Sequence, residues 1–357
     1  MEYLILNFLT LYVIYIYNKY YKSSHARYFI SIAVVFMLSL LPSLQYGVGS
    51  DYFSYERIYN NTNILEYYYK NNEIAFYYLV KIVRYFDFDS KFFFIIISIL
   101  QSLLIISSFN ILKRHGYNLV IIFFLFFTVT NLLHTQMNII RASFAIYLFI
   151  LALLYKLENK KIKFLFFIII AILFHKSAFV VIPILLIPIK WYTWFYKHAL
   201  TIYISTFFIY FLNPFSPISK YIIDTFFPYY SLYLTEGNFT KVSIVNLFTK
   251  LYYLPIIIYF FSIIKNVRID DYSNRLIGLW AITANMFILV YHFDFFSRIN
   301  YFFVYFYIIP LYYSLISTFN RKKYRLALVM ILYILAPYTL KVIVFPIAEF
   351  KYNTFLF

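Results

Sequence analysis

The sequence has no cysteine, few glycines and few acidic residues. The absence of cysteine excludes disulfide bonds, thiolate metal ligands and cysteine nucleophiles. None of the five glycines forms a GxxxG pair, so the helices must pack through alanine, serine and bulky side chains. No Walker loop, dinucleotide-binding fingerprint, HExxH or GxSxG motif is present, and no dedicated set of metal ligands is evident. The sequence therefore predicts no cofactor and no metal, and it does not support an ATP-driven, redox or zinc-protease function.

Apolar residues dominate what is present. Of the 357 residues, 64% are hydrophobic. Runs of about 20 apolar residues, each long enough to cross a bilayer, recur along the chain. The strand alternation typical of outer-membrane barrels is absent from the sequence. We therefore expect an all-α, polytopic integral membrane protein with about 10–12 transmembrane helices, which form a single transmembrane domain over residues 1–357.

The basic residues are distributed unevenly along the chain. There are 31 Lys and Arg residues against 14 Asp and Glu, but most of the basic ones lie in short loops between apolar runs, so nucleic acid is not expected as a partner. These loops contain only three acids and are predicted to be cytoplasmic by the positive-inside rule. The longer segments, residues 45–91 and 213–250, are then external. The predicted cytoplasmic loops are residues 19–27, 113–115, 156–163, 190–198, 265–275 and 320–325.

Local signals predict where the apolar runs are interrupted. Residues 119–155 would form a helix of about 55 Å, nearly twice the ~30 Å hydrocarbon core, so we expect a break near residues 131–138. Two prolines interrupt residues 178–189, as in the broken helices that line cavities or lie inside a protein. Within the first external segment, residues 52–60 are predicted to be helical, and residues 74–84 are predicted to lie on the membrane surface.

The polar residues that are unusual for a membrane protein all fall on the predicted outer side. Cations at the outer ends of hydrophobic spans are costly and usually have a partner or a function. Four separate regions supply them, which predicts a site for an anionic substrate, because arginine can bind two phosphate oxygens at once. The residues are Asp51, Glu56, Arg57, His134, Asn138, Arg141, His175, Lys176, Asp294 and Arg298.

Each of these residues also has a purely structural interpretation. Asp51 is placed to cap the helix over residues 52–60. Asp294 and Arg298 have the i, i+4 spacing of a helical ion pair. His175 fits a satisfied interfacial histidine, and Arg141 could extend to the lipid headgroups.

Four stretches resemble the EpsG-like branch of the Wzy-type polysaccharide polymerases. They are YGVGSDYFSYERIY (46–59), NIIRASFA (138–145), AILFHKSAFVVIP (171–183) and FSRINYFFVYFYIIP (296–310), and their order and spacing are similar to the family over most of the chain. The third is the most specific, because the family has a similar F-H-x-[ST]-A run at the outer end of a span. The family usually has Gln after the arginine that corresponds to Arg141, whereas this chain has Ala142.

The resemblance implies polymerisation of undecaprenyl-diphosphate-linked oligosaccharide repeat units on the outer face of the bacterial cytoplasmic membrane. The implied partners are the lipid-linked repeat units, membrane lipids, a chain-length regulator and other polysaccharide-assembly proteins. We expect Arg141 and Arg298 to bind the diphosphate leaving group. Arg57 and Lys176 are expected to assist them, Asn138 and Asp294 to contribute to substrate binding, and Asp51 or His175 to act as general base for the acceptor hydroxyl.

Two other classes of function remain alternatives. A flippase or exporter of lipid-linked saccharides would also need cations, but they would line a path through both leaflets, and this chain has few ionisable residues at mid-span. Among enzymes, an O-antigen ligase-like transferase or a membrane acyltransferase is the other alternative.

Overall fold

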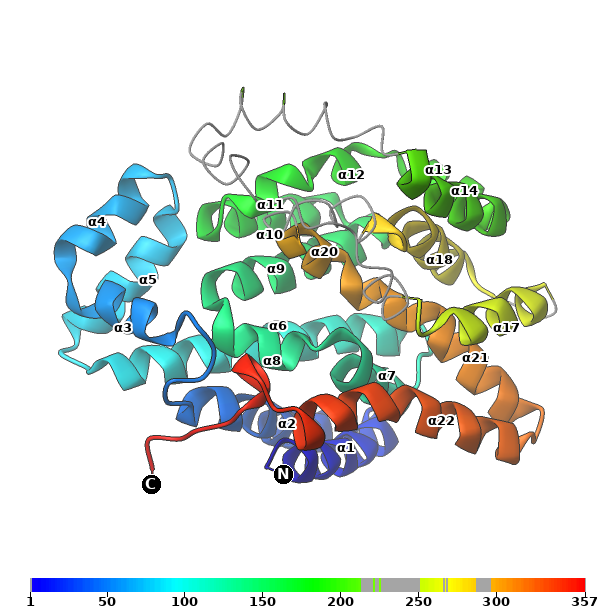
Figure 1. The fold of residues 1–357 in the computed structure, drawn as a ribbon, viewed down its shortest axis with the longest axis horizontal. Helices are drawn as coiled ribbons and strands as arrows, with labels where there is room; N and C mark the ends of the chain where they lie inside the picture. Colours follow the sequence, from blue (N-terminus) through cyan, green and yellow to red (C-terminus); the bar gives the residue numbers. More distant parts are fainter. Residues whose placement is uncertain are drawn as a thin grey trace. The chain divides into compact units, whose positions relative to one another are not determined.

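The computed structural model describes residues 2–212, 221, 225, 251–265, 267, 269–286 and 297–356. Every regular element in these residues is a helix, apart from one isolated bridge between Gln45 and Thr354 (Figure 1). The predicted all-α class is therefore confirmed. The chain divides into two compact units, Met1–Ile182 with Leu328–Phe357 and Pro183–Ala327, and each is described by itself. The single domain over residues 1–357 stays a prediction.

Five helices in the described part of the chain are long and apolar enough to span a membrane, and a bent pair would make a sixth. These helices confirm a multi-pass membrane protein. They are fewer than the predicted ten to twelve spans, because several apolar runs form shorter helices; the 14-residue α10 (Lys161–Phe174), for example, is about 21 Å long. The five are α2 (Ser24–Leu44), α6 (Ser90–Arg114), α9 (Ile140–Leu157), Ile299–Asn320 and Tyr324–Val344.

Helix α9 forms the centre of the first unit. It is hydrophobic on all sides, and nearly every one of its side chains is buried, as expected of a helix enclosed by protein. It lies between α6 and α10 in Figure 1 and packs against both. The remaining long helices of this unit are α1 (Glu2–Tyr20), α2 and most of α22 (Tyr324–Thr339).

The long apolar run before α9 is broken, as its length predicted. Helix α7 (Leu119–Leu125) continues into a π-helical turn, Phe126–Thr130, and Asn131 then adopts a left-handed φ of 57°. Asparagine tolerates this conformation better than most residues. The following α8 (Leu132–Asn138) is bent by 51° from the segment before it. A second break at Ile139 separates α8 from α9, which places Asn138 and Arg141 at a helix junction.

The first of the two predicted external segments folds into three helices, α3 (Tyr52–Asn60), α4 (Thr62–Lys70) and α5 (Ile74–Tyr85). The bounds of α3 agree with the prediction for residues 52–60, whereas α4 was not predicted. Helix α5 covers the predicted surface stretch and packs against α4, α6 and α10, with Val80 fully buried. One face of α5 is therefore part of the protein core.

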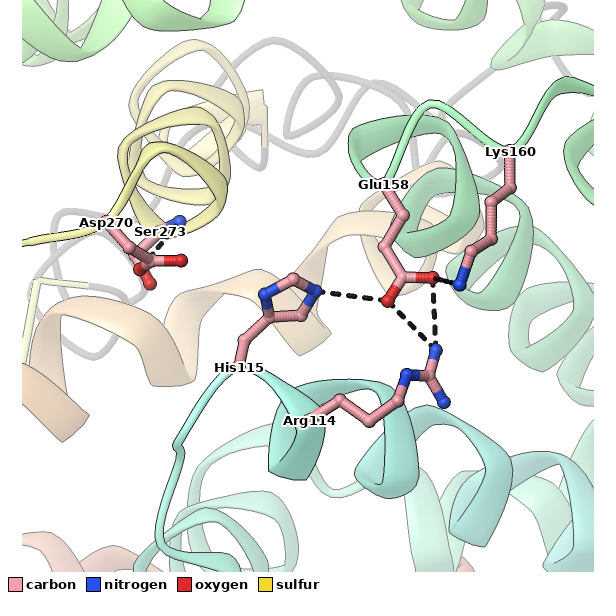
Figure 2. A network of polar contacts seen from close by, with 6 residues as sticks. All are labelled: Arg114, His115, Glu158, Lys160, Asp270 and Ser273. Carbon is pink, nitrogen blue, oxygen red and sulfur yellow. Dashed lines mark hydrogen bonds and ion pairs between the residues drawn. The ribbon is translucent and has the colours of Figure 1, made fainter.

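A cluster around Glu158 ties together two predicted cytoplasmic loops of the first unit. The Glu158 carboxylate accepts hydrogen bonds from Arg114 (2.9 and 3.0 Å) and Lys160 (2.7 Å), and it lies 3.0 Å from His115 Nε2 (Figure 2). Burial opposes ionisation of Glu158, but these basic partners lower its pKa overall. Loops 113–115 and 156–163 therefore lie at the same end of this unit, as the charge pattern predicted.

The second unit contains α13 (Ile189–Lys197), α14 (Ala199–Leu212), α17 (Leu254–Ile264), α18 (Asp271–Thr283), α20 (Ser297–Val304) and α21 (Ile308–Asn320). Helix α18 packs against α13 and α14, and its first turn is capped by Asp270, which accepts from Ser273 N (Figure 2). Apart from residues 221 and 225, the predicted external segment 213–250 lies outside the described residues.

Candidate functional site

A buried carboxylate, Glu73, lies at the centre of the candidate site. It stands at the N-cap position of α5, immediately after the turn that ends α4, where Asn72 has a φ of 62°. The backbone N–H of Glu73 donates to Tyr68 O, which closes the turn. The residue is only 5% exposed, although it belongs to a segment that the charge pattern predicts to be external. A buried ionisable group requires a partner, and the turn directs this carboxylate toward two helix junctions.

Two other segments of the first unit contribute groups to Glu73. Arg141 Nη1, from the first turn of α9, donates to Glu73 Oε2. His175 Nδ1, directly after α10, lies 3.2 Å from Glu73 Oε1. The backbone N–H of Lys176 donates to the same oxygen at 3.4 Å, while Lys176 Nζ donates to Asn71 Oδ1 at 3.0 Å. The structure thus brings together three of the predicted site residues, Arg141, His175 and Lys176.

Arg141 is held within the first unit by contacts of both its side chain and its backbone. Its guanidinium lies 4.3 Å from the centre of the Tyr68 ring and 5.3 Å from that of Phe76. Its backbone N–H donates to the Tyr55 hydroxyl at 3.3 Å. The side chain is 18% exposed, and Nε has no hydrogen-bond partner among the described residues. Cation–π stacking and the carboxylate therefore fix the plane of the guanidinium.

The electrostatics favour an ionised Glu73. Burial by itself raises the pKa of this carboxyl, but the hydrogen bond and charge of His175, the charge of Arg141 and the Lys176 N–H together bring it below the ordinary value. Burial raises the pKa of Tyr55 and Tyr68, although the nearby Arg141 charge opposes the shift. At neutral pH the cluster therefore contains a carboxylate, a guanidinium and neutral phenols.

Asn138 has a structural role next to this cluster. Its Oδ1 accepts from Ser50 N (3.0 Å), Ser50 Oγ (3.2 Å) and Asp51 N (3.2 Å), which fastens the glycine-containing loop before α3 to the α8–α9 junction. Gly49 has a φ of +76°, and a Cβ at this position would lie 2.6 Å from Asn138 Oδ1. Both features require glycine here.

The other predicted residues lie elsewhere or outside the described residues. Asp51 occupies the N-cap position of α3, but its side chain makes no capping hydrogen bond and instead accepts from Ser50 Oγ. Arg57 is exposed and donates within its own helix, to Phe53 O and Ser54 Oγ. Asp294 and the side chain of Arg298 lie outside the described residues.

Sequence reasoning also grouped His134 with this site, but the structure places it in a different environment. His134 is buried against the C-terminal part of the first unit, where Nε2 lies 2.9 Å from the Tyr338 hydroxyl and the ring stacks on Phe350. Its described contacts are therefore with Tyr3 of α1 and with the C-terminal residues Tyr338 and Phe350, and not with Glu73.

Glu73 was missed by the sequence analysis. The available signal was weak: an acid after Asn71-Asn72, a pair typical of turns, and directly before an amphipathic helix. That pattern predicts an N-cap residue, and nothing in its spacing indicates Arg141 or His175 as a partner. Only the packing of α5 against α10 brings them together.

The arrangement combines a possible base with groups that orient it. A histidine paired with a carboxylate is a common acid–base unit, because the anion orients the ring and stabilises its protonated form. The backbone N–H of Ser177 also lies 3.3 Å from His175 Nδ1 and can donate to it only while Nδ1 carries no proton, so this contact competes with donation from Nδ1 to Glu73. Among the described residues no group of three or more His, Asp or Glu side chains is arranged to hold a metal ion.

Comparison with known proteins identifies a family. The model of the EpsG family matches residues 27–355, which is most of the chain. No curated protein and no solved structure matches this chain.

Proposed function

This chain belongs to the EpsG family, and on that premise we propose that it is a membrane glycosyltransferase that polymerises undecaprenyl-diphosphate-linked oligosaccharide repeat units. Family membership supports a polysaccharide-polymerase type of role in general. The lipid carrier, the repeat unit and the outer face of the bacterial cytoplasmic membrane belong to the proposal.

The proposed reaction transfers a growing chain from one lipid carrier to another repeat unit. A hydroxyl oxygen of the acceptor sugar attacks the anomeric carbon of the donor. The new glycosidic C–O bond forms while the bond from that carbon to the phosphate oxygen breaks, and undecaprenyl diphosphate leaves with the electron pair. The hydroxyl proton must pass to a base, and the leaving diphosphate must have its charge stabilised.

The cluster around Glu73 can meet both needs. We assign proton removal to His175, with Nε2 as the receiving atom because Nδ1 faces Glu73. The Glu73 anion then stabilises the imidazolium that forms. Lys176 and the donors of Arg141 that Glu73 does not use are assigned to the diphosphate, since a guanidinium carries five N–H donors. Asp51, the alternative base, stands at the neighbouring loop that Asn138 holds in place.

One observation supports this proposal most strongly. Glu73, Arg141 and His175 come from three segments far apart in the sequence, yet they meet in one partly buried cluster. The segments are the external hairpin and the ends of α9 and α10 that the charge pattern predicts to face outward. Independent extension of cations to the headgroups would not bring them onto one carboxylate.

The sugar ladder of a deletion strain tests the proposal. A strain without this chain should display single repeat units only, whereas loss of all surface sugar would indicate a flippase and refute polymerisation. In the complemented strain, His175→Ala should leave single repeats at normal protein level, and His175→Gln should not restore the ladder because an amide cannot accept a proton at neutral pH. His25→Ala removes an exposed histidine from α2 and serves as the matched control. A full ladder from His175→Ala would exclude this residue as the base.

A further inference from the structure

The second unit contains a cavity of about 270 Å³ that the proposed chemistry does not use. It lies where the α13–α14 turn meets the end of α17 and the side of α18. Its walls are mostly apolar, with Phe260, Phe261 and Ile264 from α17, Leu200 from α14 and Ile277 from α18. These side chains suit a hydrocarbon occupant better than a sugar, which needs many hydrogen-bonding partners.

Two lysines also line this cavity. Lys197 ends α13 and Lys265 directly follows α17, and both are exposed. In the part of the chain that the structure describes, neither forms an ion pair or a hydrogen bond. The two residues come from separate loops, 190–198 and 265–275, which the charge pattern places on the cytoplasmic side. The cavity therefore joins apolar walls to two cationic groups on the same end of this unit.

Helix α13 has the character of a helix at a membrane interface. Trp191 and Trp194 are each 50% exposed, and Lys190 and Lys197 stand at the two ends of the helix. Tyr192 faces the other way, is fully buried, and donates its hydroxyl hydrogen to Ile184 O at 2.8 Å. Tryptophan concentrates at the headgroup level of bilayers, so α13 marks that level beside the cavity.

The wall formed by α13 is built into the fold. A Cβ on Gly278 of α18 would lie 1.9 Å from Tyr192 O, so the two backbones pack as closely as only glycine allows. Phe260 packs edge-on against the buried Trp280 of α18, with ring centres 5.5 Å apart. These contacts hold α13, α17 and α18 around the cavity without a ligand.

We infer that this cavity binds an anionic phospholipid. The phosphate would lie between the ammonium groups of Lys197 and Lys265, and the first methylenes of an acyl chain would lie against Phe260, Phe261 and Ile264. Basic pockets between helices on the cytoplasmic side suit acidic headgroups, because the lysines attract the phosphate while the apolar walls hold the chain. The volume of about 270 Å³ lies just below the roughly 300–1,000 Å³ that is usual for ligand sites, and it suits the headgroup and proximal chain rather than a whole lipid.

Native mass spectrometry of the full-length protein in mild detergent tests this inference. The protein is titrated with phosphatidylglycerol and, separately, with phosphatidylcholine of the same acyl chains. The wild type should retain phosphatidylglycerol in clear preference to phosphatidylcholine. The variant Lys197→Gln/Lys265→Gln should retain phosphatidylglycerol about 30-fold less well, since each basic group near an acidic headgroup contributes about fivefold. Lys190→Gln/Lys323→Gln removes two exposed lysines of the same unit that do not line the cavity, and it should bind like the wild type.

Several results would overturn the inference. Equal retention of phosphatidylglycerol by both double variants would remove the lysines from the site, and equal retention of the two lipids by the wild type would show that headgroup charge is not recognised. Displacement of phosphatidylglycerol by soluble glycerol phosphate would indicate a free-phosphate site without a role for the apolar walls. If the Lys197→Gln/Lys265→Gln variant does not fold, the salt dependence of the wild type provides the test. Binding of phosphatidylglycerol through the two lysines must weaken in 1 M salt, where charges are screened beyond about 3 Å, and binding that does not change with salt would contradict the inference.

Discussion

Replacement of Glu73 by glutamine tests the centre of the candidate site. Glutamine has nearly the shape of glutamate and keeps an oxygen that can accept from Lys176 N, so packing and one hydrogen bond are preserved. What the substitution removes is the negative charge that Arg141 and His175 share. It therefore separates the electrostatic contribution of Glu73 from its contribution to packing.

The expected loss of stability is about 3 kcal/mol. Breaking a buried ion pair by removing one partner costs about 3–5 kcal/mol, because the other charge is left without compensation. Here the remaining cation keeps its stacking on Tyr68 and is 18% exposed, which favours the lower end of this range. Glu66→Gln is the matched control: Glu66 lies on the same hairpin, is half-buried and accepts one hydrogen bond from Tyr77. The Glu66→Gln substitution should lower the stability by about 1 kcal/mol or less.

The assay must report on the first unit. All three tryptophans lie in the second unit, so intrinsic fluorescence is unsuitable, but the chain has no cysteine of its own. A cysteine introduced for Ala145, which is fully buried in α9, becomes reactive to a maleimide only when this unit opens. Increasing fractions of denaturing detergent then give the free energy of opening for each variant. Equal values for Glu73→Gln and Glu66→Gln would refute the buried ion pair.

The same substitution has a defined pH dependence. Because the pKa of Glu73 is lower in the folded protein than its ordinary value of 4.5, its charge stabilises the fold fully above that pH. The contribution is lost as the pH falls through the lowered pKa and the carboxylate becomes protonated. The stability difference between wild type and Glu73→Gln should therefore be largest at neutral pH and shrink below pH 4.5. A difference that is independent of pH would show that charge is not its cause.

Three further predictions address the diphosphate, the loop and the topology. Arg141→Lys should shorten the sugar ladder strongly, and Arg141→Ala should leave single repeats, because truncating a charge-assisted contact costs about 2–5 kcal/mol; a normal ladder from the alanine variant would exclude diphosphate binding there. Gly49→Ala should destabilise more than Gly116→Ala in heat-unfolding measurements, since both positions have a positive φ but only a Cβ at Gly49 meets a neighbouring side chain, at 2.6 Å; equal losses would exclude that clash. In intact cells, a membrane-impermeant maleimide should label a cysteine replacing Asn61 and not one replacing Lys160, and the reverse result would move the whole cluster to the inner face.

The sequence by itself determined the class of protein and several local features. A long continuous apolar run in a bilayer forms all its backbone hydrogen bonds within itself when it is a helix. The recurrence of such runs therefore predicted the all-α membrane protein that the structure confirms. The break before α9 followed from the length of the run, and the helix over residues 52–60 was predicted with Asp51 as its candidate capping residue. These signals lie in residues that are close together in the sequence, and for that reason they can be recognised without knowledge of the fold.

Only the tertiary structure decided which charged residues meet. Arg141, His175 and Lys176 were singled out as unusual, but their shared partner Glu73 lies about seventy to one hundred residues away, on a hairpin whose docking depends on the packing of α5 against α10. Arg57 lies in the same predicted external segment as Glu73 and has the same charge as Arg141, yet it is exposed on α3. The strength of a pairing between charges depends on their separation and burial, and neither quantity is encoded in spacing along the chain.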